Sequence, residues 1–340
     1  MGIKNLHKFL RNKDIDLYNV VHLSDFAFKK IAVDVSLYVY KYKTILGDDW
    51  LDAFIRLIMA LRRNEVHCVF IFDGKCPVEK IKEQQRRRET KDKISDRIDN
   101  LKTDIDNYIE NGEITENLLK ISKKNTNKRL LSNKLDVGFL NTYLEKIQKQ
   151  QVYMSSDDVE KAKQLFTILD TPYYISETEA ETLCAYLNKK GIVDAALSED
   201  TDLLAYSTPK FLHKINTYND TCHLIEFNDI LESLEFTKEQ FIDLCIMSGT
   251  DYNPNIPKVG NVTAYKLLKE HGSIENIDKD TSILNYKRAR EIFTQDLTIP
   301  DVKFCGEPDW NKLKIFLKMN QSRVNIESIK KSYEPCEIVF

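Results

Sequence analysis

The sequence predicts an α/β fold in which a mainly parallel central sheet is flanked by helices. Short apolar runs typical of buried strands alternate along the chain with segments that carry apolar residues at helical spacing. Glycine and proline are scarce, at 10 and 8 of 340 residues, which favours regular elements joined by short connections. Because parallel strands need crossover helices, this alternation predicts a sheet covered by helices on both faces.

The first elements are predicted to be two strands separated by helices. Residues 29–42 begin with alternating apolar residues up to Asp34 and continue with helical spacing. Residues 50–61 have the spacing of an amphipathic helix, and the compact apolar run that follows ends at Asp73. We therefore expect strand, helix, helix and buried strand, with an aspartate at the end of each strand.

The middle of the chain differs in composition from its flanks. Residues 75–151 are polar and charged with little strand character, so we expect helical excursions outside the core, with a possible flexible section at 120–134. The pattern then returns to alternation, and the tail past Asp251 reads as helical. The expected elements are a helix over 157–169, strands in TPYYISE, IVDAALS, FLHKI and HLIEF, and helices in AETLCAYLNKKG and KEQFIDLCIMSGTDY.

Composition excludes several classes of protein. No apolar run approaches the roughly 18 residues of a membrane span, and no secretory leader is visible. The opening MGIKNL has Leu6 where a myristoylation signal needs Ser or Thr. The seven cysteines are scattered without a CxxC pair, which indicates reduced thiols and no zinc site.

The stretch SETEAETLC places three glutamates at every second position. Like charges at this spacing share one face of a strand, and the outer pair would be neighbours on a helix, so either structure is destabilised by repulsion. Glu177 and Glu179 precede a predicted helix, and we expect Glu181 to be an acid of its first turn, favoured by the helix dipole.

Further aspartates stand where predicted strands end. In an open α/β sheet the ligand site lies beyond the carboxyl ends of the strands, so side chains placed there can converge. Any one such aspartate is more often a helix cap or a turn residue. The signal lies in the set of seven carboxylates, Asp34, Asp73, Glu177, Glu179, Asp200, Asp202 and Asp251.

Seven converging carboxylates require cations. Two carboxylates about 5 Å apart repel by roughly 3 kcal/mol at an effective dielectric near 20. Ligation by oxygen alone selects hard ions such as Mg²⁺, with Mn²⁺ as a substitute. Two such ions suit an in-line attack of water on a phosphodiester.

Basic segments complement this acidic set, although such runs are usually solvated helix faces. Between Lys75 and Lys93 there are eight basic and four acidic residues, a net charge of +4, and residues 120–134 carry six basic residues and no acid. Lys80 and Arg87 are seven apart and so share one helical face. They could reach over the acidic site to a phosphate, which predicts a nuclease.

These motifs resemble the flap-endonuclease family of structure-specific 5′ nucleases over nearly the whole chain. MGIKNL is similar to the N-terminus of that family, and KIAVDVSLYVY resembles the strand of its first metal aspartate. Residues 307–334 resemble the helical segment after its catalytic core. The remaining carboxylate motifs match in order as VFIFDG, SETEA, SEDTDLL and FIDLCIMSGTDY.

The resemblance implies roles for individual residues. One metal ion would be held by Asp34, Asp73, Glu177 and Glu179, and the other by Asp200, Asp202 and Asp251. Lys80 and Arg87 would contact the scissile phosphate as catalytic residues. The implied DNA contacts are those two residues with Gly2, Tyr40 (stacking on a base), Glu177, Gly249 and Asp251, and with Lys258 and Gly260 of a helix–two-turn–helix.

The resemblance also implies the organisation of the chain. A PIN-like nuclease core would form one compact catalytic domain, with a helical arch that admits single-stranded 5′ ends. Its regions would be an N-terminal nuclease region (1–95), the arch (96–150), an internal nuclease region (151–248), and the helix–two-turn–helix with a helical C-terminal segment (249–340).

Cofactors and partners follow from the same resemblance. Two Mg²⁺ ions and a K⁺ ion at the helix–two-turn–helix are implied, and the partner is branched or flapped DNA with 5′ single-stranded ends. We expect a monomer without a sliding-clamp peptide or a membrane partner. The expected location is the nucleus, or a cytoplasmic replication site for a viral member, and not the secretory route.

Several departures from the family pattern leave more than one DNA structure possible as the substrate. The loop IPKVGNVTAYKLL keeps Gly260 but has Lys258 where glycine is usual, and Glu181 stands where the family usually has a small residue. The interval of 104 positions from Asp73 to Glu177 predicts an elaborated arch. An end-resecting exonuclease or a Holliday-junction resolvase on the same core are the alternatives, and a non-catalytic DNA-binding scaffold is a third. An aspartyl-phosphate phosphatase is set aside, because Ser36 stands where its second acid is needed.

Overall fold

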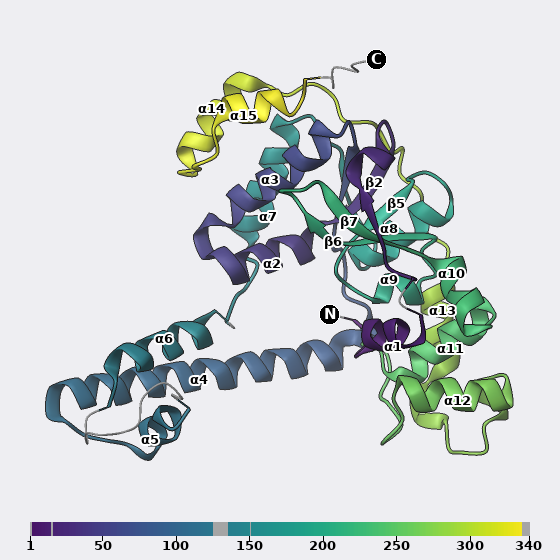
Figure 1. Cartoon of the computed structure of the whole chain (residues 1–340), viewed down its shortest axis with the longest axis horizontal. Helices are drawn as coiled ribbons and strands as arrows, with labels where there is room; N and C mark the ends of the chain where they lie inside the picture. The colour runs from purple at the N-terminus through teal and green to yellow at the C-terminus, as the bar shows by residue number, and fades with distance from the viewer. Residues whose placement is uncertain (1, 15, 125–134, 150, 335–340) are drawn as a thin grey trace.

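A computed structural model describes residues 2–14, 16–124, 135–149 and 151–334. Within these ranges the chain forms one mixed sheet of seven strands, in the order β1-β7-β6-β5-β2-β3-β4 (Figure 1). The strands are β1 (Asn19–His22), β2 (Lys30–Asp34), β3 (His67–Phe72), β4 (Tyr173–Ile175), β5 (Ala195–Leu197), β6 (Lys210–Asn216) and β7 (Thr221–Glu226).

The predicted fold class is confirmed, because the five neighbouring strands from β6 to β4 are all parallel. The remaining two pairings are antiparallel: β7 pairs with β6, and β1 pairs with β7 at the edge of the sheet. Sequence analysis did not predict β1 or the helix before it, because short edge elements carry little periodic signal.

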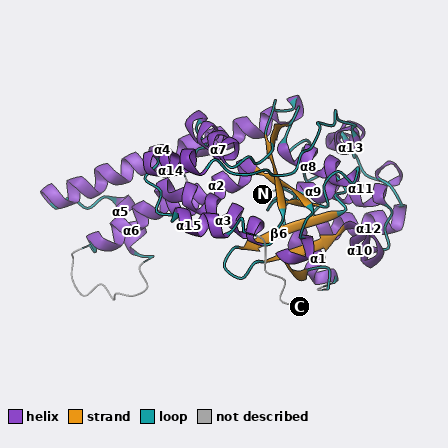
Figure 2. Cartoon of the chain, turned by 90° about the horizontal axis from the view of Figure 1, so that it is seen from above, coloured by secondary structure: helices purple, strands orange, loops and turns teal. Residues whose placement is uncertain are grey.

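Helices cover both faces of the sheet, as Figure 2 shows from above. One layer packs on the face to which β3 contributes Cys68, Phe70 and Phe72, and the other on the face of Val69 and Ile71, as strand alternation requires. The first layer is α2 (Val35–Leu46), α3 (Trp50–Arg63), α7 (Ser156–Ile168), α14 (Trp310–Met319) and α15 (Ile326–Lys331). The second is α1 (Leu6–Lys13), α8 (Ala180–Lys189), α9 (Asp202–Ala205), α10 (Phe227–Leu234), α11 (Lys238–Ser248), α12 (Asn261–His271) and α13 (Tyr286–Thr294).

Three helices project away from the sheet and have an apolar core of their own. They are α4 (Ile81–Asn111), α5 (Glu116–Ser122) and α6 (Val137–Gln148), seen at the lower left of Figure 1. Leu101 and Leu118 are fully buried between them. α4 runs unbroken across the expected boundary between residues 95 and 96, so one rigid helix joins this projection to the core. Most of the section at 120–134 lies outside the described residues.

Two further findings refine the expectations. The tail past Asp251 is not helical throughout: residues 295–309 contain no helix and run between α13 and α14. In the described ranges no helix is long and apolar enough to cross a membrane.

A buried histidine and a half-buried one pack together between α1 and β6. The ring of buried His213 stacks on that of His7, with 4.7 Å between ring centroids, and its centroid lies 5.3 Å from that of His223. Burial lowers the pKa of His213 to about 2, and the neighbouring His7 and His223 lower it further. Burial, together with the cationic Lys214 and Arg11, lowers the pKa of His7 to about 4. Both rings are therefore neutral in the folded protein.

The histidine pair should make folding stability depend on pH. Because both pKa values lie below the unfolded value of 6.5, the unfolded chain binds more protons as the pH falls below it, and stability is lost. His213→Phe keeps an aromatic ring, so the loss in unfolding free energy between pH 7 and pH 5 should shrink by about 2 kcal/mol relative to the parent.

Urea unfolding at the two pH values measures this difference. Comparing variant with parent cancels the acidic groups elsewhere, and His22→Gln, at an exposed histidine, is the control. An unchanged pH dependence in the His213 variant would contradict the assignment.

Candidate active site

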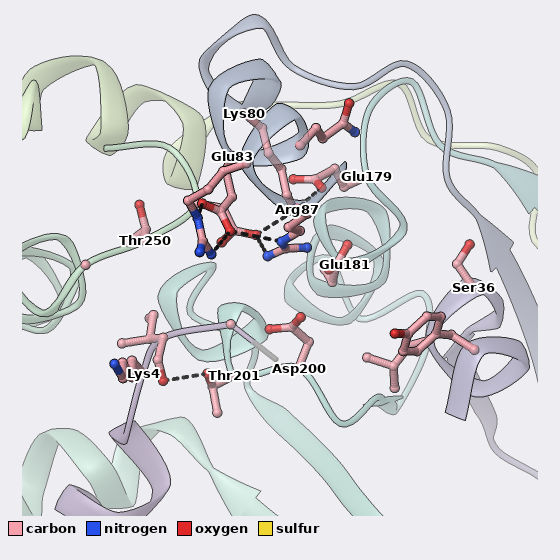
Figure 3. Close-up of a pocket in the computed structure, with 18 of the residues that line it drawn as sticks. Lys4, Ser36, Lys80, Glu83, Arg87, Glu179, Glu181, Asp200, Thr201 and Thr250 are labelled. Carbon is pink, nitrogen blue, oxygen red and sulfur yellow. Dashed lines mark hydrogen bonds and ion pairs between the residues drawn. The ribbon is translucent and has the colours of Figure 1, made fainter. Parts of the chain in front are cut away.

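A cavity of about 1110 Å³ lies at the carboxyl ends of the parallel strands, beneath the start of α4 (Figure 3). Its walls come from residues that are far apart in the sequence. Seven carboxylates line it: Asp34, Asp73, Glu83, Glu179, Glu181, Asp200 and Asp251, of which Glu83 belongs to α4 itself. They surround the basic side chains of Lys80, the last residue of η3 (Val78–Lys80), and of Arg87 on α4.

 The six carboxylates that α4 does not carry come from strand ends, the start of α8 and the loop after α11, so only the tertiary fold gathers them.

Asp34 ends β2 and also caps the helix that follows. Its Oδ1 accepts a hydrogen bond from the backbone N–H of Leu37 (3.2 Å), and its Oδ2 accepts one from the hydroxyl of Ser198 (3.2 Å). Burial raises the pKa of Asp34 to about 8, and repulsion from Asp73 and Asp200 contributes. Asp34 therefore both caps α2 and contributes a carboxylate to the acidic cavity.

Asp73 follows β3 and reaches the start of α8. Its Oδ1 accepts a hydrogen bond from the backbone N–H of Ala180 (2.9 Å). Gly74 makes this approach possible, since a Cβ there would lie 1.8 Å from the carbonyl oxygen of Ser176. The glycine of the VFIFDG motif thus allows the 73–75 and 176–178 segments to hydrogen-bond side by side.

Asp200 and Asp202 follow β5 and are both buried. The Oδ1 of Asp200 accepts a hydrogen bond from the backbone N–H of Asp202 (3.0 Å), whereas the Oδ1 of Asp202 has no partner among the described residues. Burial raises the pKa of both carboxyl groups, and for Asp202 the charges of Asp200 and Asp251 raise it further. Asp202 lies behind the cavity wall, and Asp200 is part of it.

The N-terminal segment packs directly on this pair. Gly2 has a φ of +74°, and a Cβ at this position would lie 2.0 Å from Oδ1 of Asp200 and 2.7 Å from Oδ1 of Asp202. The glycine is therefore required by both its backbone conformation and the close approach.

Lys80 and Arg87 extend from the start of α4 onto the carboxylates. The ammonium of Lys80 is buried, pairs with Glu179 and lies 3.0 Å from Oδ2 of Asp251. Arg87 donates to the same oxygen of Asp251 (2.7 Å) and to Glu83 of its own helix (3.0 Å). The seven-residue spacing therefore does place both cations on one face, as predicted.

The electrostatics of Lys80 depend on these partners. Burial alone would lower the pKa of its ammonium, but the charges of Glu179, Glu181 and Asp251 outweigh it and raise the pKa. In this structure the two basic side chains supply part of the positive charge that the acidic cavity needs.

The structure does not bring Glu177 together with the other predicted ligands. Its side chain is exposed and lines a separate cavity of about 250 Å³ with Tyr174 and Leu297. Residues 176–179 form an irregular bend and Glu179 is the N-cap of α8, so the two glutamates do not share a strand face as the alternating spacing suggested. In this structure Glu177 therefore lines a different cavity from Glu179, and its role as a metal ligand stays a prediction.

Glu181 does lie in the first turn of α8, as expected, but it faces the cavity rather than solvent (Figure 3). Burial raises its pKa well above the ordinary value, and the charges of Asp34, Asp200, Glu179 and Asp73 raise it further. The favourable interaction of a first-turn acid with the helix dipole was enough to explain a glutamate at position 181. Nothing in the neighbouring sequence indicated that its side chain points into the cavity.

Aromatic and basic residues extend the cavity along α4. Tyr40 of α2 lines it, and the ammonium of Lys91 lies 5.5 Å from the Tyr40 ring centroid and 4.4 Å from that of Tyr153. Lys91 also donates to the carbonyl oxygen of Val152 (3.3 Å). Sequence analysis did not single out Lys91 or Tyr153, although the four-residue spacing from Arg87 places Lys91 on the same helix face.

Gly249 and Lys258, both in the loop between α11 and α12, have positive φ angles. Gly249 has a φ of +95° and lines the cavity, whereas Lys258 and Gly260 lie outside its lining. Lys258 adopts a left-handed φ of +65°, a conformation in which glycine carries no steric cost. Asn255 closes the loop by donating to the carbonyl oxygens of Ser248 (3.3 Å) and Val259 (2.7 Å).

The donor set suits a hard divalent cation, although the side chains are not yet gathered around one point. Within the described ranges, no three Asp, Glu, His or Cys side chains are close enough to hold a metal ion. Glu179 and Asp251 are held instead by Lys80 and Arg87. The unpartnered oxygen of buried Asp202 and the many carboxylate oxygens of the cavity wall fit Mg²⁺ or Mn²⁺.

Comparison with known sequences identifies two regions of the chain. Residues 1–94 match the XPG N-terminal domain, and residues 170–251 match the XPG I-region. A probable RAD2-like endonuclease of Invertebrate iridescent virus 3 is 33% identical over 344 residues, covering 92% of this chain and 89% of the relative. Flap endonuclease 1 of Glycine max is 30% identical, covering 99% and 87%.

Solved structures share the fold. The catalytic core of Rad2 in complex with DNA substrate superposes with a TM-score of 0.68 at 17% identity, covering 97% of this chain and 98% of that one. Flap endonuclease-1 from Methanococcus jannaschii gives 0.63 at 22% identity, covering 93% and 95%. The family predicted from the motifs is confirmed: the chain belongs to the XPG family of nucleases, together with the flap endonucleases and the RAD2-like endonucleases.

Proposed function

We propose that this chain is a structure-specific 5′ nuclease that hydrolyses phosphodiester bonds in flapped or branched DNA with the help of two Mg²⁺ ions. One observation carries the proposal: carboxylates from β2, β3, β5, α8 and the loop after α11 meet in one cavity beneath two basic side chains. Phosphodiester hydrolysis of this kind requires carboxylates that bind the cations and basic side chains that bind the phosphate.

The carboxylates divide into two groups. Asp34, Asp73 and Glu179 would hold one ion, and Asp200, Asp202 and Asp251 the other, as the family resemblance implies. Glu177 is left out of this set, because its side chain faces another cavity. When bound, the ions supply Lewis-acid chemistry and favour ionisation of a water molecule at neutral pH.

The basic side chains have a second role once DNA is bound. Cations in the cavity would release Glu179 and Asp251 from Lys80 and Arg87, because the carboxylates would then be neutralised by metal. The ammonium and guanidinium would then be free to donate to the scissile phosphate and to stabilise the charge that develops on it. The guanidinium can do so through two parallel hydrogen bonds.

Residues around the cavity would position the DNA. Tyr40 offers an aromatic face on which a base can stack, and Gly2 and Gly249 line the cavity without a side chain that would hinder the DNA backbone. Lys258 and Gly260 lie on the loop that would contact the uncut duplex, with K⁺ as a further ligand of the helix–two-turn–helix. Contacts of this kind are dominated by phosphates, so affinity should fall steeply with salt.

The projecting helices decide which DNA structure is admitted. Lys80 lies just before α4 and Arg87 in its first turns, and the three-helix core lies towards its far end, so α4 would form one side of a passage for a single strand. This favours a flap with a free 5′ end. Human GEN1, solved in complex with Holliday junction DNA, has the same fold (TM-score 0.63, 18% identity), which keeps a junction resolvase as the second candidate.

The biological setting follows from the proposed chemistry. Cleavage of 5′ flaps or junctions serves DNA replication, repair or recombination, in the nucleus or at a viral replication site. We expect the chain to act as a monomer, because one copy supplies both the carboxylates of the cavity and the basic side chains of Lys80 and Arg87.

Asp200→Asn tests the metal-dependent reaction. The amide keeps the acceptor for the N–H of Asp202 and removes the charge, so cleavage with Mg²⁺ should fall by about 100-fold or more while DNA binding persists. The assay uses labelled 5′-flap, nicked, bubble, four-way-junction and linear DNA, with Mg²⁺ or with chelator. Equal activity of parent and variant, or cleavage in the presence of chelator, would overturn the two-metal proposal. If the parent cuts the four-way junction in preference to the 5′ flap, the chain is a junction resolvase and not a flap endonuclease.

Arg87→Ala tests the phosphate contact. The variant loses a donor to the transition state, so kcat should fall by about 10²- to 10³-fold with a smaller change in KM. Arg88→Ala is the matched control, because Arg88 is the next residue of α4, is exposed and carries the same charge. Single-turnover cleavage measures both, and a similar loss in the two variants would show that net charge alone matters.

A further inference from the structure

Glu181 combines three properties that a surface helix residue would not have. It is the second residue of α8, only 9% of it is exposed, and its side chain lines the acidic cavity. Figure 3 shows it beside Glu179 and Asp200 beneath the basic side chains of α4. It accepts no hydrogen bond and forms no ion pair with any residue in the described ranges, so both carboxylate oxygens are available to a ligand.

Its helix position does not explain this placement. A first-turn acid is favoured by the helix dipole, but that interaction is available at the surface and needs no burial. Glu239 shows the ordinary case, because it is the second residue of α11 and is exposed. Burial of Glu181 among other carboxylates costs free energy unless a cation compensates it.

The basic side chains nearest to Glu181 form ion pairs with other carboxylates. Lys80 pairs with Glu179 and Asp251, and Arg87 pairs with Glu83 and Asp251. Neither forms an ion pair with Glu181. Lys80 therefore acts on Glu181 only through its charge at a distance, and a bound cation would supply the direct partner that the described residues do not provide.

We propose that Glu181 is an additional ligand for a hard divalent cation in this cavity, from a position where the family usually has a small residue. It would bind together with Glu179 of the same helix start, either directly or through a water molecule. An added carboxylate increases both the number of oxygen donors and the attraction for the ion, so this chain should hold Mg²⁺ or Mn²⁺ more tightly than without it. The inference rests on the proposed metal-dependent function.

Metal binding without DNA tests the assignment directly. Titration of Mn²⁺ into full-length parent and Glu181→Gln, followed by electron paramagnetic resonance, should show about 10-fold or weaker binding in the variant. Glu239→Gln removes the same charge from the same helix position on α11 and should bind as the parent does. Parental affinity and ion number in Glu181→Gln would overturn the proposal.

Thermal unfolding provides a second readout. Without metal, Glu181→Gln should raise the Tm, because it removes a repulsive buried charge, and saturating Mg²⁺ should then raise the Tm by less than in the parent. A purely structural role would change the Tm equally with and without metal, and that result would count against a ligand. If glutamine packs poorly, Glu181→Ser offers the small residue usual in the family.

Asp200→Asn separates this proposal from the proposed function. If Asp200→Asn loses Mn²⁺ binding and Glu181→Gln does not, the nuclease site stands and the role of Glu181 fails. If neither variant changes Mn²⁺ binding, the metal site itself is wrong. Weaker binding in both supports the two proposals together.

Discussion

Carboxylates crowd one edge of the sheet, and their mutual electrostatic repulsion has to be offset by positive charge. Parallel strands deliver their carboxyl ends to the same edge, so Asp34, Asp73 and Asp200 meet because of the topology. Burial makes the repulsion stronger than it would be in water, and the raised pKa of Asp34 and Asp200 records this cost. Lys80 and Arg87 supply positive charge that offsets part of this repulsion, and the proposed cations would offset the rest.

α4 connects that compensation to the choice of substrate. Its first turns carry Lys80 and Arg87 onto the carboxylates, and its later turns form a small separate core with α5 and α6. Because one helix serves both regions, a movement of the projecting helices would also move the basic side chains. Under the proposed function, admission of a DNA strand would therefore be coupled to the position of Lys80 and Arg87.

Much of the site was predictable from local sequence, because strand ends and helix starts are readable from periodicity. The pattern of β2 and β3 placed Asp34 and Asp73 correctly, and the seven-residue spacing placed both cations of α4 on one face. Side-chain direction in irregular backbone was not predictable. The bend at 176–179 turns Glu177 away from the cavity, and the start of α8 turns Glu181 into it.

By itself the sequence determined the fold class, the family and the set of acidic and basic residues, because these depend on periodicity and on short motifs in order. Only the tertiary structure decided which of those residues share a cavity. It also decided that Lys80 and Arg87 pair with Glu179 and Asp251, contacts that span up to 171 residues of chain. The physical reason is that convergence and burial are set by packing between distant elements, whereas a sequence pattern specifies only how each element presents its own side chains.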